Sequence, residues 1–318
     1  MMKRYLHNPV ISRRDIVSDL KELSDVSSVF NPGAILFNGK ITLLLRVQNR
    51  GRETLLVKAV SDDGYKFDIS SQAVNIRGLD FDGDRKIYHI YDPRITMLDG
   101  NYYIICAVDT SEACFLGLFE TQDFDNLDFI DFISEPNVRN GVLFPEKIDD
   151  YYYRLERPNE HVLANGTKTG IAITISKSKD LIKWERISEL FSGRPHYWDE
   201  LIGSGPPPIK TRHGWLHIYH GVATHFSSSN IYQAGYSLLD LKSPEKVLYR
   251  SKYNILEPRE LYELTGQVPN VVFPSGMIGV DYDSEGYLCD DSRILIYYGA
   301  ADTVVALVET SLNELLKM

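Results

Sequence analysis

The chain repeats one two-strand unit five times. Each copy has a short apolar strand with Pro or Gly near its start, a polar turn, and an aromatic-rich strand that ends in a polar or charged residue. The copies begin at Asn31, Tyr91, Asn140, Ile202 and Pro269. One such unit cannot bury its apolar faces alone, so it packs against its neighbours, as in repeat proteins and propellers.

Further strand-like segments separate the copies, so that each unit supplies about four short strands, which is typical of a propeller blade. Helical periodicity is confined to residues 15–25 and 310–318. A β-sandwich would space its strands similarly but would not repeat this motif. We therefore predict an all-β, five-bladed β-propeller with a central active-site cavity and short terminal helices, forming a single catalytic domain over residues 1–318.

Composition narrows the class of protein. The formal net charge of −10 argues against nucleic acid or an anionic membrane as partner, because binding to phosphate groups needs clustered Lys and Arg. The N-terminus lacks the apolar core of a signal peptide, and no run is apolar for 18 residues. Three cysteines without metal-ligand spacing suggest reduced thiols. We expect a cytoplasmic protein without a metal.

Polar residues end the strands that the repeats place innermost. In a propeller these strands line one channel, so residues dozens of positions apart become neighbours. The residues concerned are Arg46, Asp92, Arg94, Asp109, Arg139, Arg157, His220 and Asp302. Polar groups at such positions cost stability unless they are paired or used. Salt bridges within the channel would be a purely structural explanation.

Asp92 is our candidate catalytic acid. It follows Tyr88 and Tyr91, and we expect aromatic walls to raise the pKa of its carboxyl by desolvation. An ordinary Asp-Pro turn is the alternative. Several arginines around one cavity suit a phosphate or another oxyanion. His220 has no Ser or Cys partner at a recognisable spacing, so a hydrolase triad is unsupported.

Eight ordered motifs resemble one known family. They are RVQNRGRE, IYDPRI, RNGVLFPEKI, LERP, IGSGPPPIKT, GWLHIYHGV, GQVPNVVFP and YYGAADT, and the resemblance runs from about His7 to the C-terminus. They occur in the same order in the β-mannoside phosphorylases and β-mannosidases of glycoside hydrolase family 130. The resemblance implies a five-bladed β-propeller and an inverting enzyme.

The resemblance also implies roles for single residues. Asp92 of the YDPR motif matches the general acid, which delivers its proton to the glycosidic oxygen through a substrate hydroxyl. Arg46, Asn49, Tyr91, Arg94 and Asp302 form the expected substrate-binding set. Arg139, Arg157, His220 and Tyr232 match the residues that hold inorganic phosphate in the phosphorylases.

One position departs from the phosphorylase pattern. Leu201 stands where those enzymes carry a lysine, directly before IGSGP, and it follows Asp199 and Glu200. Losing an ammonium group weakens a dianion site. A carboxylate there would instead suit hydrolysis, since inverting hydrolysis needs a second carboxylate to activate water. Glu200 or Asp199 is the expected base in that case.

We thus expect an inverting phosphorylase of β-mannosides that releases α-mannose 1-phosphate, with a small oligosaccharide and inorganic phosphate as its partners and no cofactor. The alternatives are an inverting β-mannosidase and a non-catalytic sugar-binding propeller that stacks sugars on Trp198, Trp215 and the tyrosines. We expect the loops at residues 161–170 and 224–232 to decide linkage, β-1,4 or β-1,2, and acceptor sugar. The family often self-associates, which leaves a homo-oligomer open.

Overall fold

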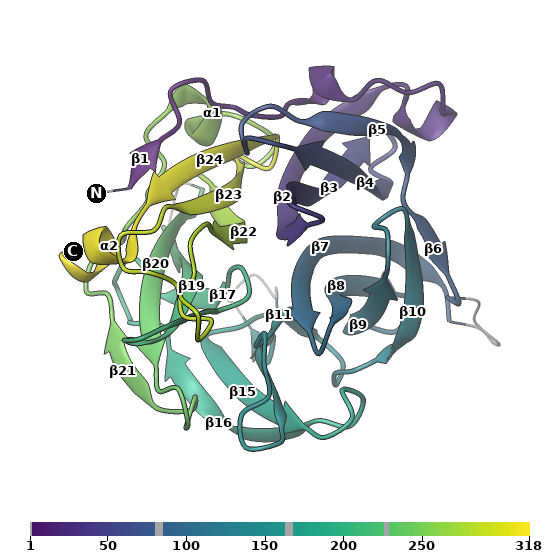
Figure 1. The fold of residues 1–318 in the computed structure, drawn as a ribbon. Coiled ribbons are helices and arrows are strands. Elements are labelled where there is room, and N and C mark those ends of the chain that lie inside the picture. The colour runs from purple at the N-terminus through teal and green to yellow at the C-terminus, as the bar shows by residue number, and fades with distance from the viewer. Residues whose placement is uncertain (1, 80–84, 163–167, 226–228) are drawn as a thin grey trace.

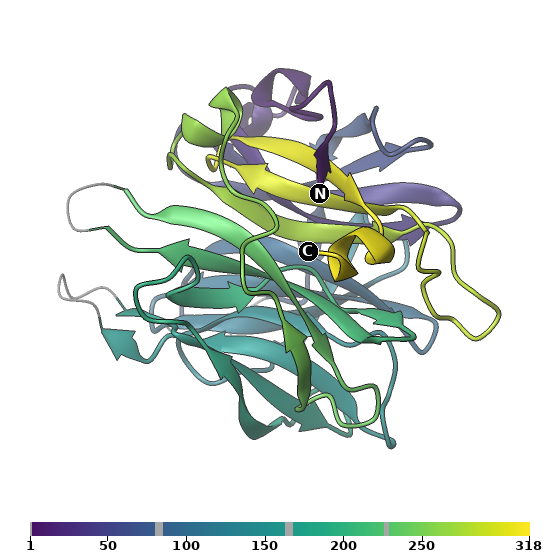
Figure 2. The same ribbon diagram turned by 90° about the vertical axis from the view of Figure 1, so that its left-hand side faces the viewer.

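The computed structural model describes residues 2–79, 85–162, 168–225 and 229–318. Five β-sheets stand as blades around a central axis (Figures 1 and 2). Each repeat lies on the two innermost strands of one blade, so the five-bladed β-propeller predicted from the repeats is confirmed. Alternating apolar side chains let each blade bury both faces against its neighbours.

The first two blades lie within the N-terminal half. Blade one contains β2 (Val26–Phe37), β3 (Lys40–Asn49), β4 (Thr54–Ser61) and β5 (Asp68–Ala73). Blade two contains β7 (Ile87–Leu98), β8 (Asn101–Thr110), β9 (Cys114–Thr121), β10 (Asn126–Phe132) and, parallel to β10, β6 (Asn75–Arg77). The remaining pairings in these two blades are antiparallel.

Blades three and four follow in chain order. Blade three contains β11 (Val138–Leu143), β12 (Tyr152–Pro158), β15 (Ala172–Ser178) and β16 (Glu185–Ser192), with a small ribbon of β13 (His161–Val162) and β14 (Lys168–Thr169) beside it in the sequence. Blade four contains β17 (Leu201–Ser204), β18 (Ile209–Thr211), β19 (Gly214–Ala223), β20 (Ile231–Leu239) and β21 (Val247–Arg250).

The fifth blade joins the two ends of the chain. It contains β22 (Val272–Gly279), β23 (Ile294–Ala300), β24 (Val304–Thr310) and, outermost, β1 (Lys3–Arg4). Arg4 also donates from Nε to Glu263 Oε1 at 2.8 Å, and the Glu263 side chain is fully buried. This contact ties the N-terminus to α1 (Leu261–Leu264), and the antiparallel pairing of β1 with β24 joins the two ends of the chain in one blade.

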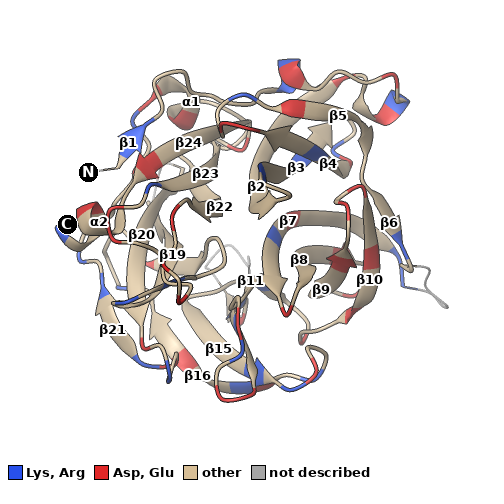
Figure 3. Ribbon diagram, in the orientation of Figure 1, with Lys and Arg blue, Asp and Glu red and all other residues tan. Residues whose placement is uncertain are grey.

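Five apolar clusters hold the blades together, each formed mainly between two neighbouring blades. Trp215 and Phe144, for example, meet edge to face at a centroid distance of 5.2 Å between blades three and four. Charged residues lie mainly on outer strands and loops, and the inner strands are mostly uncharged (Figure 3). The few charges at the centre therefore stand out.

Helical structure is sparser than the sequence suggested at one end. The segment 15–25 contains one 3₁₀ turn, η2 (Lys21–Leu23), and meets a second, η1 (Arg13–Asp15), only at Asp15, so the helix expected there is wrong. The expected C-terminal helix is present as α2 (Leu312–Leu316), which Ser311 caps. Within the described ranges, no helix has the length and apolar character needed to cross a membrane.

Candidate active site

A cavity of about 640 Å³ opens at the centre of the ring, where the inner strands end. All five blades contribute polar side chains to its wall. They include Arg46 from blade one, Asp92 and Asp109 from blade two, Arg139 and Arg157 from blade three, His220 and Tyr232 from blade four, and Asp302 from blade five. The sequence analysis predicted this convergence, and only Arg94 of the strand-end residues is missing from the wall.

β-Bulges aim three of the wall residues into the cavity. Asn31, Asp92 and Asn140 occupy equivalent places on β2, β7 and β11, with positive φ angles of 45°, 55° and 54°. The strand register shifts beside each of them. Asn and Asp are the non-glycine residues that tolerate this conformation best, and a bulge re-aims the side chain at that point. The N-P-G, D-P-R and N-G-V sequences are therefore bulge signals inside strands.

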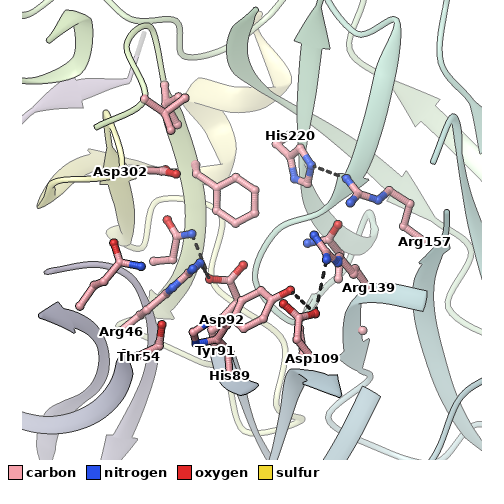
Figure 4. A pocket seen from close by; sticks show the side chains of 18 of the residues that line it. Arg46, Thr54, His89, Tyr91, Asp92, Asp109, Arg139, Arg157, His220 and Asp302 are labelled. Carbon is pink, nitrogen blue, oxygen red and sulfur yellow. Dashed lines mark hydrogen bonds and ion pairs between the residues drawn. The ribbon is translucent and has the colours of Figure 1, made fainter. Parts of the chain in front are cut away.

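Asp92 is held by two donors. Its Oδ1 accepts from Arg46 Nη1 at 2.9 Å and from Asn31 Nδ2 at 3.0 Å (Figure 4). The Arg46 guanidinium lies between the rings of Phe30 and Tyr91, 4.5 Å from each centroid. Cation–π contacts of this kind fix the direction of the guanidinium. Arg46 is thus a rigid partner for the carboxylate.

The prediction that aromatic walls raise the pKa of Asp92 is wrong for the free site. Burial does raise the pKa of Asp92, but the charges of Arg46 and Arg94 and the hydrogen bond from Asn31 outweigh it and leave the pKa below its ordinary value. Tyr88 is 56% exposed and forms no wall. Asp92 is therefore ionised at neutral pH before a ligand binds.

Asp302 is the carboxyl whose pKa is raised, to about 6. Burial is the main cause, the Asp92 charge adds to it, and Arg46 opposes it. Asp302 follows β23 in a left-handed turn with φ of 50°. Two carboxyls in one cavity with pKa values pushed apart are the arrangement that acid–base chemistry uses.

Three residues form what we call the anion end of the cavity: Arg139, Arg157 and His220. Figure 4 shows them on one side of Asp92, with Arg46 and Asp302 on the other. Burial and the charge of Arg157 hold the pKa of His220 well below its ordinary value, so the imidazole is neutral. Its Nε2 lies 3.4 Å from Arg157 Nη1 and accepts from it.

Arg157 is a cation without an anionic partner among the described residues. Its partners are the side-chain oxygen of Asn159, at 3.0 Å from Nε, and His220. No carboxylate in the described part of the chain lies within ion-pair distance of it. Burial and the nearby Arg139 charge lower the pKa of Arg157 to about 10, although Tyr232 opposes the shift. A desolvated guanidinium facing a cavity is a site for an anionic ligand.

Two members of the expected substrate-binding set lie elsewhere. Arg94 is buried beneath the wall, where its Nε donates to Gly205 O at 2.7 Å and its Nη1 to Asp92 O at 3.2 Å. Asn49 donates to Glu53 Oε2 at 2.6 Å and shapes the turn after β3. It does not line the central cavity but borders an adjoining hollow, whose wall Arg46 and Asp302 also share.

Strand alternation explains why Gln48, and not Asn49, lines the central cavity. Side chains two apart point to the same face of a strand, so Arg46 shares its face with Gln48. Gln48 lines the cavity and Asn49 does not. The role of Asn49 as a substrate contact stays a prediction, and Gln48 is the neighbour that lines the central cavity.

Both proposed hydrolytic bases are outside the cavity wall. Asp199 is fully buried, paired with Arg194 at 2.8 Å and with Arg250 at 2.6 Å, and it accepts from the Tyr219 hydroxyl. Glu200 accepts from the Thr224 hydroxyl, which lowers the pKa of its carboxyl. Neither contacts the space in front of Asp92, so the structure contradicts their assignment as base.

Leu201, the position of the family lysine, is buried in β17 opposite Val222. The proposed stacking residues lie outside the cavity as well. Trp215 is completely buried, and Trp198 stacks on Tyr219 at 5.7 Å. A sugar platform made of these two rings is therefore excluded.

Several wall residues were not predicted from the sequence. They are Asn31, Gln48, Thr54, His89, Asn140 and Phe273. Asn31 and Asn140 carried a usable signal, because they occupy the place of Asp92 in their repeats. Of the two loops expected to shape the acceptor side, residues 163–167 and 226–228 lie outside the described residues. In the described ranges no three His, Cys, Asp or Glu side chains are grouped to hold a metal ion.

Comparisons with known proteins establish the family of the chain. The model of a family described as beta-1,4-mannooligosaccharide phosphorylase, glycoside hydrolase family 130, matches residues 2–318. The chain belongs to glycoside hydrolase family 130. The resemblance seen in the eight motifs is thereby confirmed.

Relatives in family 130 cover nearly the whole chain. A 1,2-beta-oligomannan phosphorylase of Thermoanaerobacter sp. is 32% identical over 91% of this chain and 92% of its own. A beta-1,4-mannooligosaccharide phosphorylase of Ruminococcus albus is 30% identical over 98% of this chain and 88% of its own. The structure of a beta-1,2-mannobiose phosphorylase from Listeria innocua with beta-1,2-mannobiose superposes with a TM-score of 0.83 at 28% identity, covering 99% and 98% of the two chains.

Proposed function

We propose that this family-130 enzyme is an inverting phosphorylase that cleaves a terminal β-mannoside with inorganic phosphate. The single observation that carries the proposal is Arg157, a cation on the cavity wall without a carboxylate partner among the described residues. Arg139 and His220 beside it supply a second cation and a neutral ring. The names of the relatives support the same reaction.

The reaction needs one bond formed and one broken at the same carbon. A phosphate oxygen attacks the anomeric carbon of mannose while the bond to the leaving-group oxygen breaks, and the leaving oxygen gains a proton. Arg139 and Arg157 would hold the phosphate for attack from the face opposite the leaving group, which inverts the configuration and yields α-mannose 1-phosphate.

Asp92 would supply the proton, through a substrate hydroxyl. The carboxyl is ionised in the free site because Arg46 and Asn31 bind it. A bound phosphate dianion adds negative charge to the cavity and raises the pKa of Asp92, so protonation of Asp92 is coupled to the binding of phosphate. With its pKa raised to about 6, Asp302 is mostly ionised at neutral pH and accepts hydrogen bonds from sugar hydroxyls, and only its protonated form at lower pH also donates.

The experiment compares two substrates with two nucleophiles. The purified enzyme is incubated with β-1,4- and with β-1,2-mannobiose, with and without inorganic phosphate, and mannose 1-phosphate and free mannose are measured. Phosphate-dependent mannose 1-phosphate supports the proposal, and the faster substrate assigns the linkage. Equal release of free mannose in both buffers would mean that water is the nucleophile. Sugar binding without any product would mean a non-catalytic propeller.

A cytoplasmic location is part of this proposal, because a sugar phosphate is useful where metabolic enzymes can consume it. Cell fractionation with an antibody to the protein tests it. Mass measurement in solution tests the open expectation of a homo-oligomer.

A further inference from the structure

Asp109 is a carboxylate at the anion end for which the proposed reaction has no role. It ends β8, faces the cavity and is 29% exposed. Its Oδ1 accepts from the Tyr91 hydroxyl at 3.0 Å and from Arg139 Nη2 at 3.4 Å (Figure 4). A negative charge in a place that should bind a dianion requires an explanation.

The neighbours of Asp109 show what it positions. Burial holds the pKa of Tyr91 far above its ordinary value, so its hydroxyl stays protonated and donates to Asp109. The Tyr91 ring carries Arg46 at 4.5 Å from its centroid and Arg139 at 5.8 Å. The Asp109 carboxylate thus fixes the Tyr91 ring. That ring separates Arg46, which pairs with Asp92, from Arg139, which would hold phosphate.

The two arginines of the anion end are therefore unequal before phosphate arrives. Arg139 has a counter-ion in Asp109, whereas Arg157 has none in the described ranges. Arg139 also has a buried Nε without a hydrogen-bond partner in the described ranges, so its guanidinium group is not fully hydrogen-bonded. A long contact of 3.4 Å on one Nη leaves the guanidinium able to turn toward an incoming anion.

We propose that Asp109 is a positioning residue that acts as the resident counter-ion of Arg139 and sets the affinity of the site for phosphate. It keeps the guanidinium aimed into the cavity while the site is empty, and it repels the dianion when phosphate binds. The inference rests on the proposed phosphorylase function. Asp109 would thus weaken phosphate binding in addition to Leu201, which stands at the position of the family lysine.

Two substitutions separate charge from geometry. Asp109→Asn keeps an oxygen that accepts from Tyr91 and Arg139 but removes the negative charge, so phosphate should bind roughly three- to tenfold more tightly. Asp109→Ala also removes the tether, so kcat should fall while phosphate affinity gains less. The KM for the mannoside should stay within about twofold in Asp109→Asn.

Asp99→Asn is the matched control. Asp99 lies at the other end of the same hairpin, where it accepts from the Tyr152 hydroxyl at 3.1 Å and pairs with Lys147 at 3.1 Å, outside the cavity. The change of residue type and the partner types match those at Asp109. Phosphate affinity and turnover should equal those of the wild type.

The primary measurement is titration calorimetry of inorganic phosphate into each free enzyme, followed by KM and kcat for both substrates. Tighter phosphate binding in Asp109→Asn alone supports the inference, and unchanged or weaker binding overturns it. Where Asp109→Asn melts well below the wild type, Asp109→Ser serves as the neutral variant. A wild type that neither binds nor uses phosphate refutes the proposed function itself, and this outcome is distinct from a phosphate-dependent wild type with an indifferent Asp109→Asn.

Discussion

Replacing Arg157 by methionine should cost little stability and abolish phosphate binding. The change keeps a flexible apolar stem and removes the guanidinium. The fall of the Arg157 pKa to about 10 corresponds to roughly 3 kcal/mol of unfavourable charge burial, which solvent screening of a partly exposed side chain reduces to about 1–2 kcal/mol. This cost is present at every pH below about 10.

Removing the Arg157 charge relieves that cost, and the hydrogen bonds lost in Arg157→Met offset this gain in stability. Bonds to Asn159 and His220 are worth about 1 kcal/mol each. The net change in the free energy of unfolding should therefore lie within about 1 kcal/mol of zero. For a chain of this size that is a shift in Tm of about 2 °C or less.

Arg154→Met is the control on the same strand. Arg154 is 2% exposed and its guanidinium pairs with the buried Glu156, so its removal leaves an uncompensated carboxylate. Breaking such a pair costs about 3–5 kcal/mol, or roughly 6–10 °C in Tm. Both variants lose an arginine of β12, and only the structure tells them apart: Arg154 is buried and ion-paired, whereas Arg157 is half-buried on the cavity wall.

The assay is thermal unfolding in phosphate-free buffer and in phosphate, with ionic strength matched by sodium chloride. Phosphate at about 100 times its Kd should stabilise the wild type by about 2.7 kcal/mol. Arg154→Met should keep that increment and Arg157→Met should lose most of it. The reasoning is refuted if Arg157→Met melts as low as Arg154→Met, or if phosphate stabilises it as much as the wild type.

Three further predictions follow from the site and its frame. Asp92→Asn should lower kcat by about 10²–10⁴ while mannoside binding, measured by calorimetry, persists, and near wild-type turnover would remove Asp92 as the acid. Because the pKa of Asp302 is raised to about 6, its ionisation costs stability, so Asp302 should contribute a loss of Tm as pH rises from about 4 to 6. Asp302→Asn should flatten that profile, and an unchanged slope would contradict the assignment. Glu263→Gln should lose about 2–4 kcal/mol, because the buried carboxylate pairs with Arg4. Hydrogen bonds from Arg4 and the backbone lower the pKa of Glu263 despite its burial. The stability that ionised Glu263 contributes is therefore present when the pH is above the ordinary pKa of a glutamate, and it is lost as the pH falls through the lowered pKa. Urea unfolding at pH 7 and pH 3 should show the two proteins converging in acid, and parallel curves would be the contrary result.

Sequence reasoning succeeded where an inference depended on repetition. The five copies placed Asp92, Arg139, Arg157, His220 and Asp302 at corresponding strand ends, and all five line one cavity. Their convergence needs only the strand period of two and the radial symmetry of a propeller.

It failed where the outcome depended on single contacts between segments that lie far apart in the sequence. Arg94 is two residues from Asp92, yet the bulge at Asp92 turns it into the wall, where Gly205 from blade four accepts its hydrogen bond. Asp199 is two residues from the lysine position, yet Arg194 and, from β21, Arg250 pair with it away from the cavity. No local pattern reports a partner that a distant strand supplies.

The chain's amino-acid order by itself determined the number of blades, the family and the set of charges that meet at the centre, because each is written as a repeated or ordered motif. Only the tertiary structure decided how those charges divide the work. The low pKa of Asp92, the raised pKa of Asp302, the Asp109 counter-ion and the lack of a carboxylate beside Arg157 within the described ranges all depend on distances between side chains from different strands. Electrostatic free energy varies with separation and burial, and folding alone sets both.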